Sequence, residues 1–221
     1  MSTKSSKGYI GIGMEGPIAN WYAESARKDT RDQKKTARLI ADRLSAGSAI
    51  LEVAPGPGYL AIELAGLGEY KITGLDISQT FVEMARKKAK ERGVQVDFQH
   101  GNASQMPFAD NQFDQIVCVA AFKNFAEPIG ALNEMYRVLK PGGRAAIFDL
   151  RGDASEAEIN EHVNSMGLGK LNTFMIKWTF KFMLLKRAYT PASFEEMVAQ
   201  SKFKDCEIHQ DPIGMAVWLN R

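Results

Sequence analysis

The sequence predicts an α/β fold in which helices cover a mostly parallel sheet. From Ser48 onwards, short runs rich in β-forming residues alternate with longer segments of helical periodicity, which is typical of a parallel sheet wrapped by helices. The run FDQIVCVAAF is apolar along most of its length, as expected of a central strand buried on both faces. Near the chain end, DCEIHQ and MAVWLN are separated by Pro212 and Gly214 and predict a hairpin.

The remaining elements follow in chain order from local signals. The predicted strands are AILEVA, KITGLDIS, VQVDFQ from Val94, and RAAIFDL, and the predicted helices between and after them include PIGALNEMYRVL, stopped by KPGG, and PASFEEMVAQ. Ser78 can cap the N-terminus of a helix that closes at Gly93. Pro128 and the Thr190-Pro191 pair can each begin a helix.

Two segments lie outside this alternation and define the expected organisation. Residues 1–46 are predicted to form an N-terminal helical cover, with a helix near Asp32 to Leu44, and residues 151–189 a helical insertion that covers the substrate. The core then consists of residues 47–150 and 190–221. Both covering segments are placed to close over a site.

Composition excludes several classes of protein. The chain has 221 residues, of which 45% are hydrophobic, and its 28 basic residues are matched by 26 acidic ones, which does not suit a nucleic-acid-binding protein. Cys118 and Cys206 lie far apart in a pattern that predicts no metal site. The N-terminus lacks a secretion signal and no run reaches the roughly 20 apolar residues of a membrane span, so we expect a cytoplasmic protein.

The stretch ILEVAPGPGYLAIELA carries the main functional signal. Gly56, Gly58 and Ala61 satisfy a glycine-rich nucleotide-binding pattern, and Asp76 ends the next strand where a ribose-binding acid is expected. The pattern alone is compatible with a dinucleotide. However, Glu52 precedes the turn, and its carboxylate would repel an anionic pyrophosphate. A cationic ligand such as S-adenosylmethionine fits better, because its ammonium suits Glu52 and its ribose suits Asp76.

The motifs resemble, in order across about residues 50–150, those of the class I S-adenosylmethionine-dependent methyltransferases. EVAPGPG is similar to the first motif, GLDIS to the second, GNASQMPFADNQFD to the third, and RVLKPGG to the turn before the fifth strand. Within the family they are most similar to the small-molecule branch that includes the ubiquinone and menaquinone C-methyltransferases. The resemblance implies a Rossmann-like doubly wound seven-stranded sheet, mostly parallel, with an antiparallel strand in the C-terminal hairpin.

The resemblance also implies S-adenosylmethionine as cofactor and methyl transfer to a small, apolar or aromatic acceptor. The residues expected to bind the cofactor are Glu52, Ala54, Gly56, Gly58, Asp76, Ile77, Asn102, Ala103 and Ala120. We expect Asp76→Ala to abolish measurable cofactor binding.

Three positions depart from the family pattern. Ala54 stands where glycine is usual, and its methyl group is harmless only if φ is negative there. Asn102 replaces an aspartate that accepts from the adenine amino group, which predicts weaker but retained binding. Lys123 and Asn124 stand where relatives often place histidines, so a histidine base is not implied at that position.

Few residues qualify for a chemical role. The catalytic candidates are Tyr22, Lys123 and His162, while His100 and His209 are expected to be structural. Together with Tyr9 and Trp21, Tyr22 could instead close over the ligands or simply anchor the N-terminal cover.

The segment LNTFMIKWTFKFMLLKRAY, residues 171–189, predicts an apolar helix lining the acceptor pocket. The alternative is peripheral membrane contact. Two other functions stay open: an S-adenosylmethionine-binding protein that does not methylate, such as a regulator or cyclase, and an NAD(P)-dependent oxidoreductase. Neither the acceptor, the methylated atom nor the oligomeric state follows from the sequence.

Overall fold

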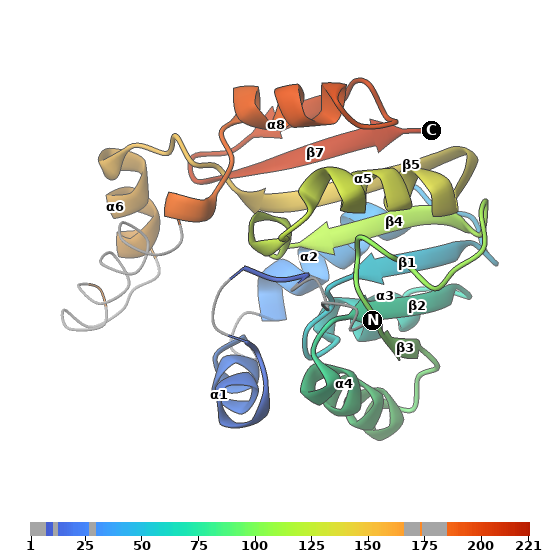
Figure 1. Ribbon diagram of the computed structural model, residues 1–221. Coiled ribbons are helices and arrows are strands. Elements are labelled where there is room, and N and C mark those ends of the chain that lie inside the picture. Colours follow the sequence, from blue (N-terminus) through green and yellow to red (C-terminus); the bar gives the residue numbers. More distant parts are fainter. Residues whose placement is uncertain (1–7, 11–12, 27–29, 166–172, 174–184) are drawn as a thin grey trace, which may run out of the picture.

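The fold is built on a seven-stranded sheet with the order β3-β2-β1-β4-β5-β7-β6 (Figure 1). It comes from a computed structural model that describes residues 8–10, 13–26, 30–165, 173 and 185–221. The strands are β1 (Ala49–Val53), β2 (Lys71–Asp76), β3 (Asp97–His100), β4 (Phe113–Val119), β5 (Leu139–Leu150), β6 (Glu207–Gln210) and β7 (Gly214–Asn220). The first five strands pair in parallel, whereas β7 runs antiparallel to both β5 and β6. The predicted sheet and C-terminal hairpin are confirmed.

The helices are α1 (Gly16–Ala26), α2 (Thr30–Ala41), α3 (Tyr59–Ala65), α4 (Gln79–Arg92), α5 (Pro128–Val138), α6 (Glu156–Ser165) and α8 (Pro191–Ala199), with short 3-10 turns η1 (Phe122–Asn124) and η3 (Leu185–Arg187). Of these, α2, α3 and α4 cover one face of the sheet and α5 and α8 the other, whereas α1 and α6 lie beside it (Figure 1). The predicted caps are present, because the Ser78 side chain accepts from Phe81 N–H and the Thr190 side chain from Ser193 N–H.

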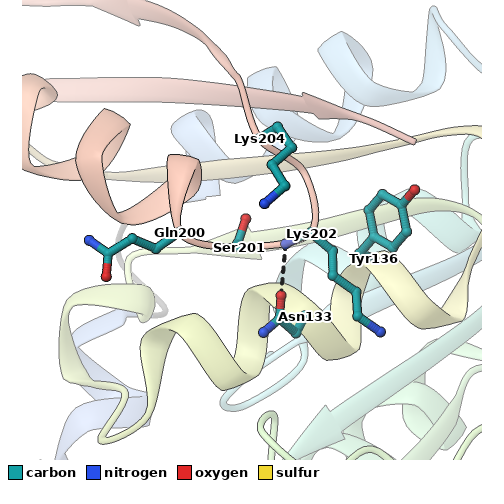
Figure 2. Close-up of a pocket in the computed structure, with 6 residues that line it drawn as sticks. All are labelled: Asn133, Tyr136, Gln200, Ser201, Lys202 and Lys204. Atoms are coloured by element: carbon teal, nitrogen blue, oxygen red, sulfur yellow. Dashed lines mark hydrogen bonds between the residues drawn. The ribbon is translucent and has the colours of Figure 1, made fainter.

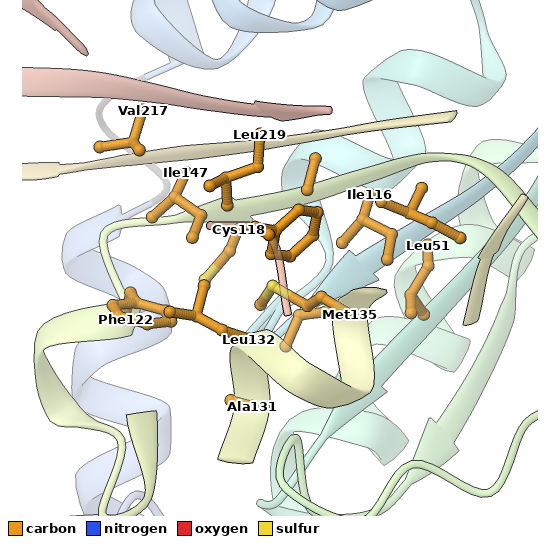
Figure 3. Close-up of a cluster of buried hydrophobic side chains, with 14 of the residues drawn as sticks. Leu51, Ile116, Cys118, Phe122, Ala131, Leu132, Met135, Ile147, Val217 and Leu219 are labelled. Atoms are coloured by element: carbon orange, nitrogen blue, oxygen red, sulfur yellow. The ribbon is translucent and has the colours of Figure 1, made fainter. Parts of the chain in front are cut away.

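The core divides into two layers because strand side chains alternate between the faces of the sheet. Leu51, Ile116 and Cys118 point towards α5 and belong to a cluster with Leu132 and Met135 of that helix (Figure 3). On the opposite face, Ile50 and Val117 of the strands belong to a second cluster. Its helical members include Ala37 and Ile40 of α2, Leu64 of α3 and Val82 of α4. The chain is therefore doubly wound, with the carboxyl ends of the parallel strands left to form a site.

Several predicted boundaries differ from the structure. The third strand begins at Asp97 rather than Val94, because Val94 N–H bonds to Ala89 O and Gly93 N–H to Lys90 O, which ends α4 in a Schellman motif. The helix predicted near residues 32–44 of the N-terminal cover is α2 and spans residues 30–41. Pairing of β5 with β4 begins at Leu139, so KPGG lies inside the strand region instead of stopping the helix.

The inserted region is described only in part. It contains α6 and η3, while most of the predicted helix over residues 171–189 lies outside the described residues. Within the part of the chain that the structure describes, no helix is long and apolar enough to cross a membrane.

Candidate functional site

A cavity of about 1150 Å³ opens at the carboxyl ends of the parallel strands. Its walls come from the loops after β1, β3 and β4, from the end of β2, and from Leu150 at the end of β5. The neighbours β1 and β4 lead away to opposite sides of the sheet, and such a switch point is where open α/β sheets bind ligands. Ligand pockets usually span about 300–1,000 Å³, so this cavity has room for two small molecules.

The glycine loop after β1 forms one wall, and its two glycines have different roles. Gly56 has φ +54°, lines the cavity, and a Cβ there would meet nothing within 4 Å. Gly58 has φ +78°, and a Cβ there would lie 2.7 Å from Phe98 and 2.8 Å from Ala85. Gly58 is not among the lining residues, so its position allows β3 and α4 to pack closely against the loop.

The methyl group of Ala54 was expected to be harmless only at a negative φ, and this residue has a positive φ. Its φ is +56°, in the left-handed region, where a side chain costs about 1–2 kcal/mol relative to the right-handed conformation. The Ala54 N–H still donates to Leu75 O at 2.8 Å, which holds the loop against β2. Ala120, at the end of β4, has the same φ of +56° and lines the same cavity. The loops after β1 and β4, which both line the cavity, therefore each begin with an alanine in the left-handed region.

Glu52 is the acid at the floor of the cavity. Its side chain is in β1, only 3% exposed, and its Oε2 atom has no hydrogen-bond partner among the described residues. Burial raises the pKa of Glu52 to about 8, although a hydrogen bond from Ala61 N–H opposes this and the nearby Asp76 adds to it. A cationic hydrogen-bond donor in the cavity would satisfy this group.

Asp76 organises the loop as well as lining the cavity. Its Oδ2 accepts from Gly56 N–H at 2.8 Å and its Oδ1 from Ser78 N–H at 2.8 Å. Burial raises the pKa of Asp76, while these two hydrogen bonds oppose the shift. Each carboxylate oxygen keeps a second lone pair for a ligand hydroxyl. Ile77, the next residue, is partly exposed in the cavity wall.

Asn102 and Ala103 line the cavity after β3, but the amide of Asn102 is already engaged. Its Oδ1 accepts from both Ser104 N–H, at 3.0 Å, and Ser104 O–H, at 3.1 Å. An amide oxygen has two lone pairs, so the predicted acceptance from an adenine amino group requires that the Ser104 hydroxyl turn away. Gly8 packs directly on this side chain, since a Cβ at Gly8 would lie 2.6 Å from Asn102 Oδ1.

The N-terminal segment closes over the site through polar contacts. The Glu15 carboxylate accepts from Gln79 N–H at 3.0 Å and from Thr80 N–H at 3.1 Å, at the N-terminus of α4. Tyr9 forms an antiparallel bridge with Phe125, and Arg187 of η3 donates to Ile10 O at 3.0 Å. The N-terminal cover and the end of the insertion therefore meet above the cavity.

Of the three catalytic candidates, two line the cavity and one does not. Tyr22 lines the cavity, with its ring 5.7 Å from that of Phe81, and partial burial raises its pKa. It is therefore a hydrogen-bond donor at neutral pH, not a base. Lys123 also lines the cavity, whereas His162 lies on α6 outside the lining residues. His100 and His209 are exposed and lie near Ile77 O and Glu207 respectively.

Sequence reasoning missed Asp149, the partner of Lys123. It lies near the end of β5, and its carboxylate is 2.6 Å from the Lys123 ammonium. An acid near the carboxyl end of an otherwise apolar strand was the available signal, because that end of a parallel strand borders the site. Glu15 was missed as well, since no local pattern links it to α4.

A second hollow lies over α5 and the loop after α8 (Figure 2). Asn133 Oδ1 accepts from Lys202 N–H at 2.8 Å, and the exposed side chains of Lys202 and Lys204 flank Tyr136. Its volume is about 370 Å³, and it lies away from the carboxyl ends of the strands. Exposed lysines around a shallow hollow are not sufficient to assign a ligand-binding site there.

The sheet has the Rossmann-like fold found in class I methyltransferases. The antiparallel β7 between β5 and β6 separates this sheet from the 3-2-1-4-5-6 order of dinucleotide-binding proteins and disfavours the oxidoreductase alternative. Residues 51–147 match a methyltransferase domain family. This part of the chain is therefore similar to the methyltransferase domain family, and its matched relatives include demethylmenaquinone methyltransferases.

Individual proteins agree with this placement. The demethylmenaquinone methyltransferase of Listeria welshimeri is 38% identical over 120 residues, which are 53% of this chain and 50% of that protein. The chain therefore spans about half the length of the curated relatives it matches. A Methanococcus maripaludis protein assigned to the S-adenosyl-L-methionine-dependent methyltransferases aligns with a TM-score of 0.75, 20% identity, and 96% and 95% coverage of the two chains.

The same fold also serves other chemistry. The 4+2 cyclase SpnF aligns with a TM-score of 0.57 and 23% identity, covering 85% of this chain and 80% of that one. Such likenesses show the fold alone. The choice between methyl transfer and another use of the cofactor therefore depends on the cavity.

Proposed function

We propose that this protein transfers the methyl group of S-adenosylmethionine to a small, apolar or aromatic acceptor. One observation carries the proposal: the buried Oε2 of Glu52 lacks a hydrogen-bond partner among the described residues and lies at the floor of a cavity beside the glycine loop. A buried acceptor without a donor is costly, and the ammonium of the cofactor would supply both the donor and the compensating charge.

The other residues of this wall suit the rest of the cofactor. Asp76 has lone pairs for the ribose hydroxyls, Ile77 offers an apolar contact to the adenine, and Gly56 leaves its side of the loop open. Ala103 and Asn102 border the same region. When bound, the cofactor supplies a methyl group on a positively charged sulfur, so the chain mainly has to align the acceptor and exclude water.

The size and lining of the cavity support a second, apolar ligand. Its volume of about 1150 Å³ exceeds the usual range for one small molecule, and Phe81, Val119, Phe125 and Leu150 contribute apolar walls. The demethylmenaquinone methyltransferases among its relatives are named for a quinone-type acceptor, which agrees with such a lining. We include an aromatic hydroxyl compound or quinol among the expected acceptors.

Several finer expectations accompany this proposal. The division into a core and two covers, the cofactor residues, and the cytoplasmic location stay predictions. Peripheral membrane contact through residues 171–189 is also a prediction, and most of that segment lies outside the described residues.

Calorimetry with S-adenosylmethionine, S-adenosylhomocysteine, NAD and NADP tests the cofactor. We expect the first two ligands to bind and Glu52→Gln to weaken both about ten- to a hundredfold, since a hydrogen bond to a charged group contributes about 1.5–3 kcal/mol. Binding of NAD or NADP alone would contradict the proposal.

A screen with a labelled methyl group tests the reaction. Phenols, quinols, amines and thiols are offered in turn, and formation of S-adenosylhomocysteine is measured with each. Tight cofactor binding without product from any acceptor class would favour the non-methylating alternatives, a regulator or a cyclase.

A further inference from the structure

Lys123 lines the cavity on the side of β4 and forms a buried ion pair with Asp149 behind it. Each residue is 8% exposed, and Lys123 Nζ lies 2.6 Å from Asp149 Oδ1. The same ammonium donates to Ala120 O at 2.8 Å. Lys123 follows β4 in η1 and Asp149 lies near the end of β5, so the pair joins two adjacent strands at their carboxyl ends.

Asp149 is well satisfied, whereas Lys123 retains capacity. The carboxylate also accepts from Lys123 N–H at 3.0 Å and from Leu150 N–H at 2.8 Å. An ammonium has three donors, and two of them are used by described residues. The third is available to a molecule in the cavity, which Lys123 lines.

Stability alone does not account for this arrangement. Replacing a buried ion pair with apolar residues of similar volume is often neutral or stabilising, because both charges lose their hydration. The surroundings are apolar, since Phe122 and Cys118 nearby are fully buried. A charged donor that lines a cavity among apolar residues is the kind of placed polar group that orients a ligand.

Charge is divided across the cavity. Glu52 and Asp76 lie on the side of β1 and β2, while Lys123, Lys186 and Arg187 line the side of β4, β5 and η3. The acidic side suits the cationic cofactor. The basic side, bordered by Phe125 and Leu150, suits an apolar molecule that carries a negatively charged oxygen.

We propose that Lys123, held in place by Asp149, binds the oxygen of the acceptor and that the acceptor is a phenolate or enolate. This inference rests on the proposed methyl transfer and narrows its substrate class. The ammonium stabilises the ionised oxygen and disfavours a protonated amine at the same position. Oxygen acceptors, and carbon acceptors activated by an adjacent oxyanion, are thereby selected over amines.

The transfer balances with the groups named. The hydroxyl proton of the acceptor leaves to solvent when the oxyanion binds beside Lys123. An electron pair of the acceptor, on oxygen or on the carbon conjugated with it, forms the new bond to the methyl carbon. The bond between methyl carbon and sulfur breaks, and its electron pair stays on sulfur as a neutral thioether.

Ionisation of a bound phenol tests the role of Lys123 directly. 4-Nitrophenol is used as probe with S-adenosylhomocysteine bound, because its phenolate absorbs visible light and can be titrated in the cavity. We expect its pKa to fall by about one to two units on binding, which is a ten- to hundredfold preference for the phenolate. Lys123→Gln should remove this shift.

Lys140→Gln is the matched control. Lys140 pairs with Asp114 at 2.8 Å near the starts of β5 and β4, at the end of these strands away from the cavity, and its loss should leave the phenol titration unchanged. Both variants should retain S-adenosylhomocysteine affinity. If Lys123→Gln does not fold, Lys123→Met combined with Asp149→Leu removes the pair without leaving a lone charge.

The outcomes separate the two proposals. Failure of the wild-type protein to bind S-adenosylhomocysteine contradicts the proposed function. Cofactor binding with no saturable 4-nitrophenol binding, with an unshifted phenol, or with a shift that persists without Lys123 overturns this inference alone.

Discussion

Binding of a cationic ligand beside Glu52 should release a proton from the protein. Burial raises the pKa of this carboxyl group from 4.5 to about 8, so about nine-tenths of the molecules carry a proton on Glu52 at pH 7. An ammonium next to the unpartnered Oε2 favours the ionised form. If the pKa returns below about 6, binding at pH 7 releases roughly 0.8–0.9 protons.

Titration calorimetry at pH 7 in buffers of different ionisation heats counts these protons. The slope of the observed heat against the buffer's ionisation heat gives the number of protons released. Glu52→Gln is the control, since it keeps the shape of the side chain and reports any proton exchange by the ligand itself. Equal numbers for wild type and Glu52→Gln would refute the reasoning, because Glu52 would then stay in one protonation state throughout.

The raised pKa of Glu52 also makes the free energy of unfolding of the ligand-free protein depend on pH. The folded state holds the Glu52 proton over a range where the unfolded chain has lost it, so the free energy of unfolding falls as pH rises from 4.5 to about 8. A displacement of this size corresponds to at most about 5 kcal/mol. Denaturant unfolding across this range should therefore show a steeper loss of stability for wild type than for Glu52→Gln, and parallel curves would contradict the raised pKa.

Three further predictions concern the backbone of the cavity loops and the N-terminal cover. Gly58→Ala should destabilise the fold by about 2–5 kcal/mol in denaturant unfolding through steric overlap and strain, whereas Gly56→Ala should cost only about 1–2 kcal/mol but weaken cofactor binding. Ala54→Gly should stabilise the fold by up to about 1 kcal/mol, because relief of strain outweighs the added freedom of the unfolded chain, while Ala121→Gly, at φ −123°, should destabilise it. Glu15→Gln should increase hydrogen exchange over residues 13–26 at neutral pH. Burial raises the pKa of Glu15, but hydrogen bonds from Thr80 and its neighbours outweigh this and lower it, so the wild-type cover should loosen only as pH falls below about 4.5.

Much of the fold is encoded in short segments. Ser78 and Gly93 fix the two ends of α4 through hydrogen bonds to residues within five positions, which is why the sequence predicts them well. The position of β7 is different, because it depends on pairing Arg144 with Asn220 across most of the C-terminal region. No local pattern places β7 between β5 and β6, and the family resemblance implied only that the C-terminal hairpin contains an antiparallel strand.

The sequence likewise predicts which residues belong to the site but not how they are hydrogen-bonded. The motif residues Glu52 and Asp76 were found from spacing, but the missing partner of Glu52 depends on how β1, α3 and β2 pack together. Likewise, Gly58 matches a ligand-binding pattern, yet the side chain of Phe98 on β3 is what excludes a larger residue there. Sequence spacing identifies which residues meet, whereas their hydrogen-bonding state is a property of the assembled sheet.

Two alanines in the left-handed region, Ala54 and Ala120, line the cavity just after β1 and β4. Together, Ala54 and Ala120 cost about 2–4 kcal/mol in the left-handed region, a sizeable part of the usual 5–15 kcal/mol of net stability. Each is held by the sheet, because Ala54 N–H donates to Leu75 O at 2.8 Å and Ala120 N–H to Phe148 O at 2.7 Å. The ligand therefore meets walls that are already ordered, and its binding energy is not spent on folding a loop.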